Sequence, residues 1–572
     1  MTTPPPTTER CWEIDRALDD LADGEAAWAA CDRATRRALL LRVHAATAEH
    51  AEAWVRAAVA YKRLPDGSPL VGEEWITGPY PVLTSCGALA ASLQALEENR
   101  SPVDGFTFGE APGGRVSVRV LPHSVWDQLL LNGFSAEVWM PPGVTRQQVR
   151  DGAGLAQLRP AETNGVGVVL GAGNITSIPI LDVLYELYAN NRVVALKLNP
   201  VTDGLLDVFG EVLAPLIDLG AVRILTGGAD VGAYLVRHPK VSHVHMTGSA
   251  ATHDAIVFGP GAEGRARKTA GTPLLGKPVT SELGGVSPTI VLPGDWSEAD
   301  LRYQAEHVAT QKLHNGGYNC VAGQVLVVSA DWAQKDRFLA HVRAALADAP
   351  ARPAYYPGSD DRVADALASY GGDAERVGGG RVLIRNVDPA DPGPALTTEY
   401  FGPVLAVVEL PGDARTFLDA AVRTANDRLT GTLGANLIAH PRTIATLGSA
   451  LDEAIAQLRY GTIALNAWTG VGYLTATAGW GAFPGHTLDD VQSGIGVVHN
   501  ALLLDGPERT VVRGPFRPAP RALLHGQPVM SPRPPWFVSN GTAATTGRLL
   551  ADFAAAPRWT ALPRIFASAL RG

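Results

Sequence analysis

The chain has 572 residues, of which 46% are hydrophobic and 18% are charged, so it can bury a large core. A chain of this length is expected to divide into about three or four domains. Its net charge of −9, from 57 acidic and 48 basic residues, leaves no broad basic surface for a phosphate backbone, which argues against nucleic acid as a partner.

The number of cysteines and the length of the apolar runs indicate the cellular compartment of the protein. The 4 cysteines are too few and too scattered for a disulfide framework, and no Cys-x-x-Cys spacing suggests zinc. The first ten residues lack the apolar run of a signal peptide, and no stretch of about 18 apolar residues predicts a transmembrane helix. We therefore expect a protein of the reducing cytoplasm that has no metal centre and no membrane span.

The first third of the chain is mainly helical by pattern. Residues 9–64 are rich in Ala, Leu and charged residues at helical intervals, which predicts two or more helices, and residues 84–99 predict another. The alternating segment 115–120 is typical of a half-exposed strand. Residues 134–160 show no clear pattern.

A strand, helix, strand series begins at residue 165. Residues 165–170 predict a buried strand, 178–190 a helix and 193–197 a second strand, which indicates a βαβ unit of a parallel sheet. Asn174 and Lys197 follow the carboxyl ends of these strands, where such sheets bind ligands. The intervening glycines do not form the Gly-x-Gly-x-x-Gly dinucleotide motif.

The next unit repeats this pattern. A helix over 205–218 precedes strands at 222–225 and 241–246, and the second strand runs into Thr247, Gly248 and Ser249. Main-chain N–H groups and a hydroxyl at a helix start suit a phosphate. The strand also carries His243 and His245 on one face. Without a third ligand nearby, hydrogen-bonded strand histidines are the more common interpretation than a metal site.

The following segments alternate between loops and core strands. Residues 260–277 predict a flexible basic surface loop. Glu282 then stands directly before two glycines. The remaining elements are predicted as follows: strands at 289–292, 324–328, 404–409 and 461–468, helices at 331–346 and 415–425, and an amphipathic helix within 559–570. We expect this last helix to dock on its own or a neighbouring subunit rather than on a membrane surface.

Cys320 lies in a loop of small residues and is the candidate nucleophile. Glycines 316, 317 and 323 permit turn conformations and bring main-chain N–H groups close to a reacting oxygen. A cysteine attacks as its thiolate, which nearby hydrogen-bond donors stabilise. Taken alone, a buried structural cysteine is the more frequent case, so the surrounding motifs decide between the two interpretations.

In their order along the chain, these motifs resemble the aldehyde dehydrogenase superfamily over about residues 165–496. The resemblance includes the asparagine after the first strand, the lysine closing the next, and the Gly-Ser pair opening the following helix. It also includes three sequence motifs: Glu-Leu-Gly-Gly-x-Ser-Pro at 282–288, Cys-x-Ala-Gly at 320–323 and Glu-x-Phe-Gly-Pro-Val at 399–404.

The resemblance implies an α/β fold with a Rossmann-like parallel-sheet cofactor domain, an α/β catalytic domain and an extended C-terminal tail. We expect N-terminal helices and the cofactor domain over 1–281, the catalytic domain over 282–478, and a return segment with the tail over 479–572. A homodimer or homotetramer is also implied.

The resemblance further implies oxidation of a small-molecule aldehyde to a carboxylic acid, with NAD or NADP as cofactor. Cys320 would form a thiohemiacetal and then a thioester, Asn174 would hold the oxyanion, and Glu282 would activate water. The cofactor would contact Lys197 and Glu399 at its riboses, Phe401 at the nicotinamide, and Thr247, Gly248 and Ser249 at the pyrophosphate.

Departures from the family pattern keep alternatives open. Tyr318 stands where a glutamine is common, and Pro200 where an acidic residue would mark NAD, so the choice between NAD and NADP stays open. The run Asn174-Ile175-Thr176-Ser177 is similar to acyl-CoA-dependent branches, and the cations Arg265, Arg267 and Lys268 suit CoA phosphates.

An acyl-CoA reductase or CoA-acylating dehydrogenase is therefore a second hypothesis. A non-catalytic scaffold is a third, and the presence of both Cys320 and Glu282 argues against it. Ile175, Trp468 and Phe483 are candidates for an apolar tunnel, which favours a long-chain or aromatic aldehyde.

Overall fold

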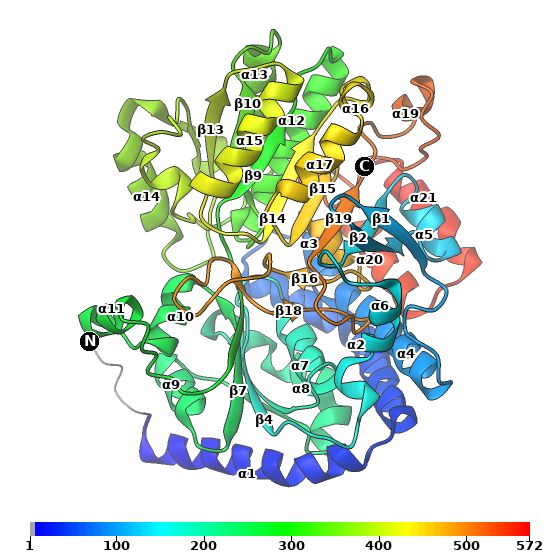
Figure 1. The fold of residues 1–572 in the computed structure, drawn as a ribbon, viewed down its shortest axis with the longest axis vertical. Helices are drawn as coiled ribbons and strands as arrows, with labels where there is room; N and C mark the ends of the chain where they lie inside the picture. The colour runs from blue at the N-terminus through cyan, green and yellow to red at the C-terminus, as the bar shows by residue number, and fades with distance from the viewer. Residues whose placement is uncertain (1–5) are drawn as a thin grey trace.

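The computed structural model describes residues 6–572 and contains two large sheets, each covered by helices (Figure 1). Residues 1–5, half of the segment in which no signal peptide was expected, lie outside the described residues. Between residues 6 and 572 no helix is long and apolar enough to cross a membrane.

The smaller sheet has 6 strands in the order β17-β8-β7-β4-β5-β6. All neighbours are parallel except β17, which pairs antiparallel with β8. This confirms the predicted parallel sheet. Its strands are β4 (Val166–Leu170), β5 (Val193–Lys197), β6 (Val222–Leu225), β7 (Val241–Gly248), β8 (Val279–Leu283) and β17 (Gly494–Ile495). The predicted domain boundary between 281 and 282 falls inside β8, so the division of the chain stays a prediction.

Helices cover both faces of this sheet. The N-terminal helices are among them, and their apolar side chains pack with those of the strands to form the core. In Figure 1, α1 lies along the base of the sheet, where it contacts β4, β5 and β6. Trp28 and Trp54, from α1 and α2, are completely buried in this region. The helices are α1 (Thr8–Ala30), α2 (Arg33–Tyr61), α3 (Val71–Thr77), α4 (Pro79–Glu97), α7 (Ile178–Tyr188), α8 (Leu206–Asp218), α9 (Ala229–Arg237) and α10 (Ala250–Val257).

The larger sheet has 11 strands in the order β1-β2-β3-β19-β15-β14-β9-β10-β13-β12-β11. Its seven central strands, from β19 to β12, run parallel. The strands are β1 (Thr107–Ala111), β2 (Arg115–Leu121), β3 (Ser135–Trp139), β9 (Ser287–Val291), β10 (Gly323–Ser329), β11 (Ala374–Val377), β12 (Arg381–Ile384), β13 (Val404–Leu410), β14 (Gly434–Ile438), β15 (Thr462–Leu465) and β19 (Arg509–Arg513).

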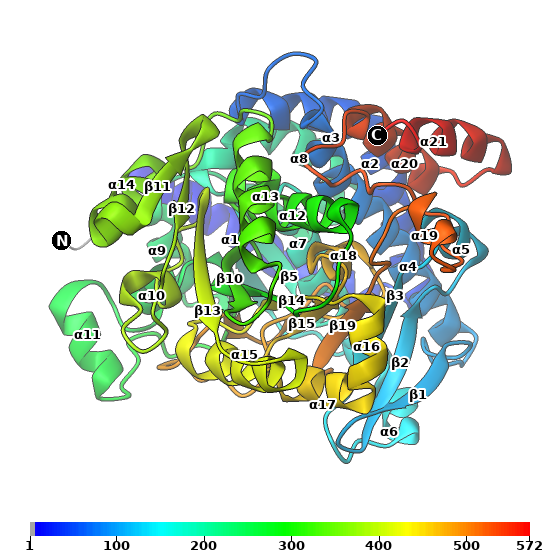
Figure 2. The ribbon, with the colours of Figure 1, turned by 90° about the horizontal axis from the view of Figure 1, so that it is seen from above.

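The side chains of strand β10 pack alternately into two apolar clusters, one on each face of the sheet. Val325 and Val327 pack into the cluster formed with α15 and α17, whereas Leu326 and Val328 pack into the cluster formed with α12 and α13. Alternate residues of a strand face opposite sides, so a continuous apolar run suits a strand covered on both faces. Figure 2 shows α12 and α13 on one side and α15 on the other. These helices are α12 (Glu298–Leu313), α13 (Lys335–Asp348), α15 (Ala414–Arg428) and α17 (Ser449–Gln457).

The remaining elements are short or lie at the periphery. They are α5 (Val125–Leu130), α6 (Arg146–Gly152), α11 (Gly261–Thr269), α14 (Ser359–Tyr370), α16 (Pro441–Leu447), α18 (Gly470–Leu474), α19 (Arg521–Leu524), α20 (Ala543–Ala555), α21 (Leu562–Ala569), β16 (Trp480–Gly481) and β18 (Val497–Val498).

Parts of the tail after residue 500 are built into the fold. Strand β19 pairs with β15 on one side and with β3 on the other, so it joins the hairpin of β1 and β2 to the large sheet. Helix α20 packs on α3, where Gly72 permits main-chain contact, because a Cβ there would lie 2.3 Å from the carbonyl carbon of Ala543. The tail therefore helps to hold the N-terminal helices in place.

The prediction of a flexible loop over 260–277 is wrong, because α11 forms within it. Pro260 precedes the first turn, and Glu263 and Arg267 pair across one turn at 3.4 Å. Gly264 lets the helix lie against the preceding chain, since a Cβ there would be 1.7 Å from the carbonyl oxygen of Gly259. The glycine that suggested a loop is a packing residue.

Candidate active site

A cavity of about 590 Å³ opens at the carboxyl ends of β4, β5 and β7 and extends to the loop before β10. Ligands of open parallel sheets bind at this edge, and the volume is within the usual range for a small-molecule site. Every site residue predicted from the sequence lines this cavity: Asn174, Lys197, Thr247, Gly248, Ser249, Glu282, Cys320, Glu399 and Phe401.

Cys320 is held in the cavity by a tight turn. Asn315 and Gly316 both have positive φ, at 53° and 70°, which places the chain in the left-handed region. Gly317 also has positive φ and lies so close to the main chain of Gly402 that a Cβ would be 2.5 Å from its carbonyl oxygen. The turn therefore requires the small residues around the cysteine, whose side chain remains partly exposed.

The thiol of Cys320 and the carboxyl group of Glu282 are in direct contact, with Sγ donating to Oε1 at 3.2 Å. Glu282 lies near the end of β8 and is 1% exposed. Burial raises the pKa of the Cys320 thiol well above its usual value, and the nearby Glu282 charge raises it further. Burial likewise raises the pKa of Glu282, which fits a carboxylate able to accept a proton.

Asn174 lies on the same side of the cavity. Its Nδ2 donates to the carbonyl oxygen of Tyr318 at 2.9 Å, two residues before the cysteine. An amide nitrogen carries two N–H groups, so one remains for a ligand. The Asn174 carbonyl oxygen accepts from Asn315 Nδ2 at 3.2 Å and from the Tyr355 hydroxyl at 3.3 Å, which fixes the main chain at this point.

The other predicted residues lie around the wider part of the cavity. Lys197 ends β5, is 7% exposed, and has its pKa lowered by burial. Ser249 caps α10 and accepts from the N–H of Thr252, so the helix begins at the predicted Gly-Ser pair. Thr247, just before this pair, donates to Asp182 at 3.1 Å.

Glu399 and Phe401 approach the cavity from the chain before β13. Burial raises the pKa of Glu399 to about 8. Gly284 makes room for this carboxyl group, since a Cβ at Gly284 would lie 1.9 Å from Glu399 Oε1. The Phe401 ring packs with Tyr356 and Tyr318, at centroid distances of 4.8 and 5.9 Å. Tyr318 thus joins an aromatic wall in place of the amide expected there.

The strand histidines are paired with acidic groups of α7. His243 Nδ1 lies 3.3 Å from Glu186, and His245 Nε2 lies 3.6 Å from Asp182. Asp182 also contacts His499 Nε2 at 3.0 Å. Across residues 6–572, no cluster of three His, Cys, Asp or Glu side chains could hold a metal ion.

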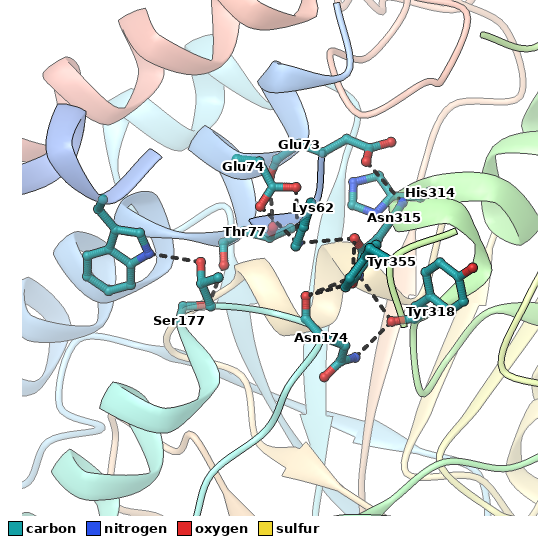
Figure 3. Close-up of polar contacts among 12 residues, drawn as sticks. Lys62, Glu73, Glu74, Thr77, Asn174, Ser177, His314, Asn315, Tyr318 and Tyr355 are labelled. Carbon is teal, nitrogen blue, oxygen red and sulfur yellow. Dashed lines mark hydrogen bonds and ion pairs between the residues drawn. The ribbon is translucent and has the colours of Figure 1, made fainter. Parts of the chain in front are cut away.

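A buried ionic cluster behind Asn174 has no clear signal in the sequence. Lys62 Nζ lies 2.8 Å from Glu74, Arg352 pairs with Glu73 and Glu74, and all four side chains are at most 6% exposed. Both cations also donate to Asn315 Oδ1, at 3.1 Å each. Figure 3 shows Lys62, Glu73 and Glu74 grouped above Asn315, with Asn174 below. The cluster therefore supports the residue that holds Asn174 and Tyr318.

A second cavity, of about 30 Å³, touches Cys320 and is called here the acyl cavity. It shares only Ile178 and Cys320 with the larger cavity, so the cysteine stands between the two. Its lining residues are Thr77, Ile175, Ile178, His314, Asn319, Cys320, Val321, Trp468, Gly470, Tyr473, Leu474 and Trp480. Ile175 and Trp468 are placed as expected, whereas Phe483 lies under Arg509, 4.8 Å from its guanidinium.

Comparisons with known proteins show what this chain is similar to. Residues 160–359 match the model of the aldehyde dehydrogenase family. N-succinylglutamate 5-semialdehyde dehydrogenase of Novosphingobium aromaticivorans is 30% identical over 329 residues, which cover 51% of this chain and 62% of that enzyme. The chain thus spans less than two thirds of the length of this curated relative.

Solved structures extend the likeness in fold to most of the chain. The NAD-dependent aldehyde dehydrogenase of Sinorhizobium meliloti has a TM-score of 0.57 at 18% identity, covering 89% of this chain and 88% of that one. The NADP-dependent glyceraldehyde-3-phosphate dehydrogenase of Bacillus halodurans, complexed with NADP, has a TM-score of 0.58 at 18% identity, covering 88% and 91%. With the motifs in order, the chain is similar to the aldehyde dehydrogenase family over residues 160–359, and it shares the fold of these enzymes over most of its length.

Proposed function

We propose that the protein oxidises an aldehyde to a carboxylic acid with NAD or NADP, through a covalent intermediate on Cys320. The observation that carries this proposal is the 3.2 Å contact between Cys320 Sγ and Glu282 Oε1, at the point where the two cavities meet. A nucleophile, a proton acceptor and an amide donor within one cavity match the requirements of acyl transfer through sulfur.

The larger cavity fits a nicotinamide dinucleotide. Gly248 and Ser249 open α10, where main-chain N–H groups suit a pyrophosphate, and Lys197 and Glu399 would hold the riboses. Glu399 Oε1 is buried without a hydrogen-bond partner, so this carboxyl oxygen is available to a ribose hydroxyl. When bound, the nicotinamide would accept a hydride from the substrate carbon.

The side chains would act in sequence. Glu282 takes the thiol proton as Cys320 Sγ forms a bond to the aldehyde carbon, and the oxyanion is held by Asn174 Nδ2 and the Cys320 N–H. After hydride loss the carbon remains bound to sulfur as a thioester. Glu282 next passes the thiol proton to solvent and is again a carboxylate. It then takes a proton from water as the water oxygen attacks the thioester, and the acid leaves as sulfur regains a proton.

The CoA-dependent alternative has little support in the structure. Arg267 donates to the carbonyl oxygen of Phe258 at 3.1 Å, and Lys268 pairs with Asp254 at 2.8 Å. Two of the three cations expected to contact CoA phosphates are therefore engaged within the protein. We expect NAD(P)H to form from aldehyde and NAD(P)+ without CoA, with the free acid as product; strict dependence on CoA would reject the proposal.

Glu282→Gln is expected to separate the two halves of the reaction. The variant removes the base for thioester hydrolysis, so steady turnover should fall by about 10²- to 10⁴-fold. It also removes the negative charge that raises the pKa of Cys320, so the thiol can lose its proton to solvent instead and the first turnover should persist. Rapid mixing should show a burst near one NAD(P)H per active site. Loss of the burst would mean that the thiol cannot lose its proton without the Glu282 carboxylate, and Glu375→Gln, at an exposed pair with Arg343, is the control.

A further inference from the structure

The buried carboxyl group of Glu282 needs a route by which it returns a proton to solvent. In the proposed reaction Glu282 takes the thiol proton of Cys320 and must lose it before it can activate water. Glu282 is only 1% exposed, although it lines the larger cavity. Its Oε2 is buried and has no hydrogen-bond partner within residues 6–572. Direct exchange with water is therefore restricted at this carboxyl group.

The face of the small sheet beside Glu282 carries polar side chains, although it is buried. In the register of β7 and β8, Thr247 is the partner of Glu282. His245 is likewise the partner of Thr280, and His243 lies on the same face because alternate residues of a strand point to one side. Strands covered on both faces are usually apolar throughout, so this row of polar residues indicates a role beyond packing.

Close polar contacts join these side chains into one series from His499 to Glu186, called here the relay chain. Its inner half is centred on Asp182 of α7, which lies 3.0 Å from His499 Nε2 and 3.6 Å from His245 Nε2. Thr247 Oγ1 also donates to Asp182 at 3.1 Å, which fixes the carboxyl group. The two histidine side chains of this half are at most 5% exposed.

The outer half of the relay chain passes through Thr280. Its Oγ1 lies 2.9 Å from His245 Nδ1 and 3.4 Å from His243 Nε2. His243 Nδ1 in turn lies 3.3 Å from Glu186. Glu186 pairs with Arg192 at 3.2 Å, and the Arg192 side chain is 20% exposed. The relay chain therefore ends beside a group that contacts solvent.

His499 connects the relay chain to the active site. Its ring packs edge-on against Tyr473, a wall residue of the acyl cavity, at 5.4 Å. Its Nδ1, like Glu282 Oε2, is buried with no hydrogen-bond partner in the part of the chain that the structure describes. Burial raises the pKa of Glu282, and a charge on His499 opposes this rise. Buried polar atoms normally have a partner, often an ordered water, and one water would join these two atoms.

The charges of the relay chain suit proton transfer. Burial alone would lower the pKa of His245, but the attraction of Asp182 more than offsets this, so its pKa lies above the usual value. A proton on His245 can then move outward, because the Thr280 hydroxyl can accept from one imidazole and donate to the other.

We propose that the relay chain carries the thiol proton from Glu282 to solvent, entering at His499 and leaving at Glu186. This inference rests on the proposed oxidation and adds the route by which Glu282 is regenerated. Each member passes on one proton as it receives one, so no electrons are exchanged and Glu282 becomes a carboxylate again. The members act through Glu282, so they are positioning residues.

Thr280→Val interrupts the relay chain at its middle, because it removes one hydroxyl and changes no charge. The first turnover should persist as a burst near one NAD(P)H per active site, since Glu282 still takes the thiol proton. Steady turnover at neutral pH should fall by at least about tenfold, because Glu282 stays protonated and cannot activate water. This rate should recover as the pH rises, because hydroxide then removes the proton, and the Kd for the reduced nicotinamide should not change.

Matched variants distinguish a relay from a structural role. Thr280→Ser keeps the hydroxyl and should keep the wild-type rate. Glu186→Gln interrupts the outer end and should reproduce the burst, the slow turnover and the recovery with pH. Thr443→Val removes a hydroxyl that donates to the Pro293 carbonyl oxygen at 3.2 Å and lines neither cavity, so it should change nothing. Full turnover of Thr280→Val, or a loss that is the same at every pH, would overturn the inference.

An activated ester separates this inference from the proposed function. Hydrolysis of para-nitrophenyl acetate would use Cys320 and Glu282 without hydride transfer, and NADH or NADPH is added to fill the larger cavity. We expect Thr280→Val to keep the burst of nitrophenol and to slow its steady release. This defect without any aldehyde oxidation would reject the oxidation and keep the relay chain. Oxidation with no effect of Thr280→Val in either assay would do the reverse, and the absence of both activities would reject both.

Discussion

Cys320→Ala is expected to lower NAD(P)H formation from any aldehyde by at least about 10⁴-fold, as loss of a covalent nucleophile does in other enzymes. The reason is geometric, because the Cys320 sulfur is in contact with Glu282 and lies between the two cavities. Steady-state assays give the rate. Quenching of protein fluorescence by NADH or NADPH shows whether the cofactor cavity remains intact, and we expect its Kd to be unchanged.

The chain provides a matched control for this experiment. Cys11 is also a free, partly exposed cysteine, but it lies on α1 and lines neither cavity. Cys11→Ala should therefore retain full activity. If Cys320→Ala kept more than a tenth of the wild-type rate while Cys11→Ala behaved normally, the chemistry would not pass through this sulfur.

The fold around the larger cavity could be predicted because its signals are local. The strands at 166–170 and 193–197 are short apolar runs, and the residues that follow them necessarily lie at one edge of a parallel sheet. Ser249 likewise caps a helix that its own neighbours specify. Such features need only a few adjacent residues, so periodicity and turn chemistry reveal them.

Other features depend on contacts between distant residues, which a single sequence does not show. Lys62 ends a helix like an ordinary solvated lysine, yet its partner Asn315 is 253 residues away. Strand β19 likewise lies within the large sheet, where its neighbours β15 and β3 come from distant parts of the chain.

Because of the buried ionic cluster, we expect the free energy of unfolding to decrease at acidic pH. Burial alone would raise the pKa of Glu73, but the attraction of Arg352 more than offsets this, so its pKa lies below the usual value. A carboxyl group whose pKa is lowered by folding stabilises the folded state above its unfolded pKa, about 4.3, and this contribution is lost as the pH falls further. The contribution of Glu73 is therefore fully present at neutral pH.

Lys62→Met is expected to destabilise the protein by about 3–5 kcal/mol at neutral pH, because it leaves an excess negative charge in a fully buried site. The double variant Lys62→Met/Glu74→Leu removes the charge pair together and should recover at least half of the loss. Urea unfolding followed by tryptophan fluorescence measures both. Arg459→Met, at an exposed pair with Asp427, should change little.

The same variants test whether the cluster positions the active site. Lys62 and Arg352 both hold Asn315, which in turn holds the main chain of Asn174 and Tyr318. Lys62→Met should therefore lower kcat more than it changes the Kd for NADH, and the double variant should restore stability better than kcat. If Lys62→Met were no more harmful than Arg459→Met in both stability and kcat, the cluster would neither stabilise the fold nor position Asn174.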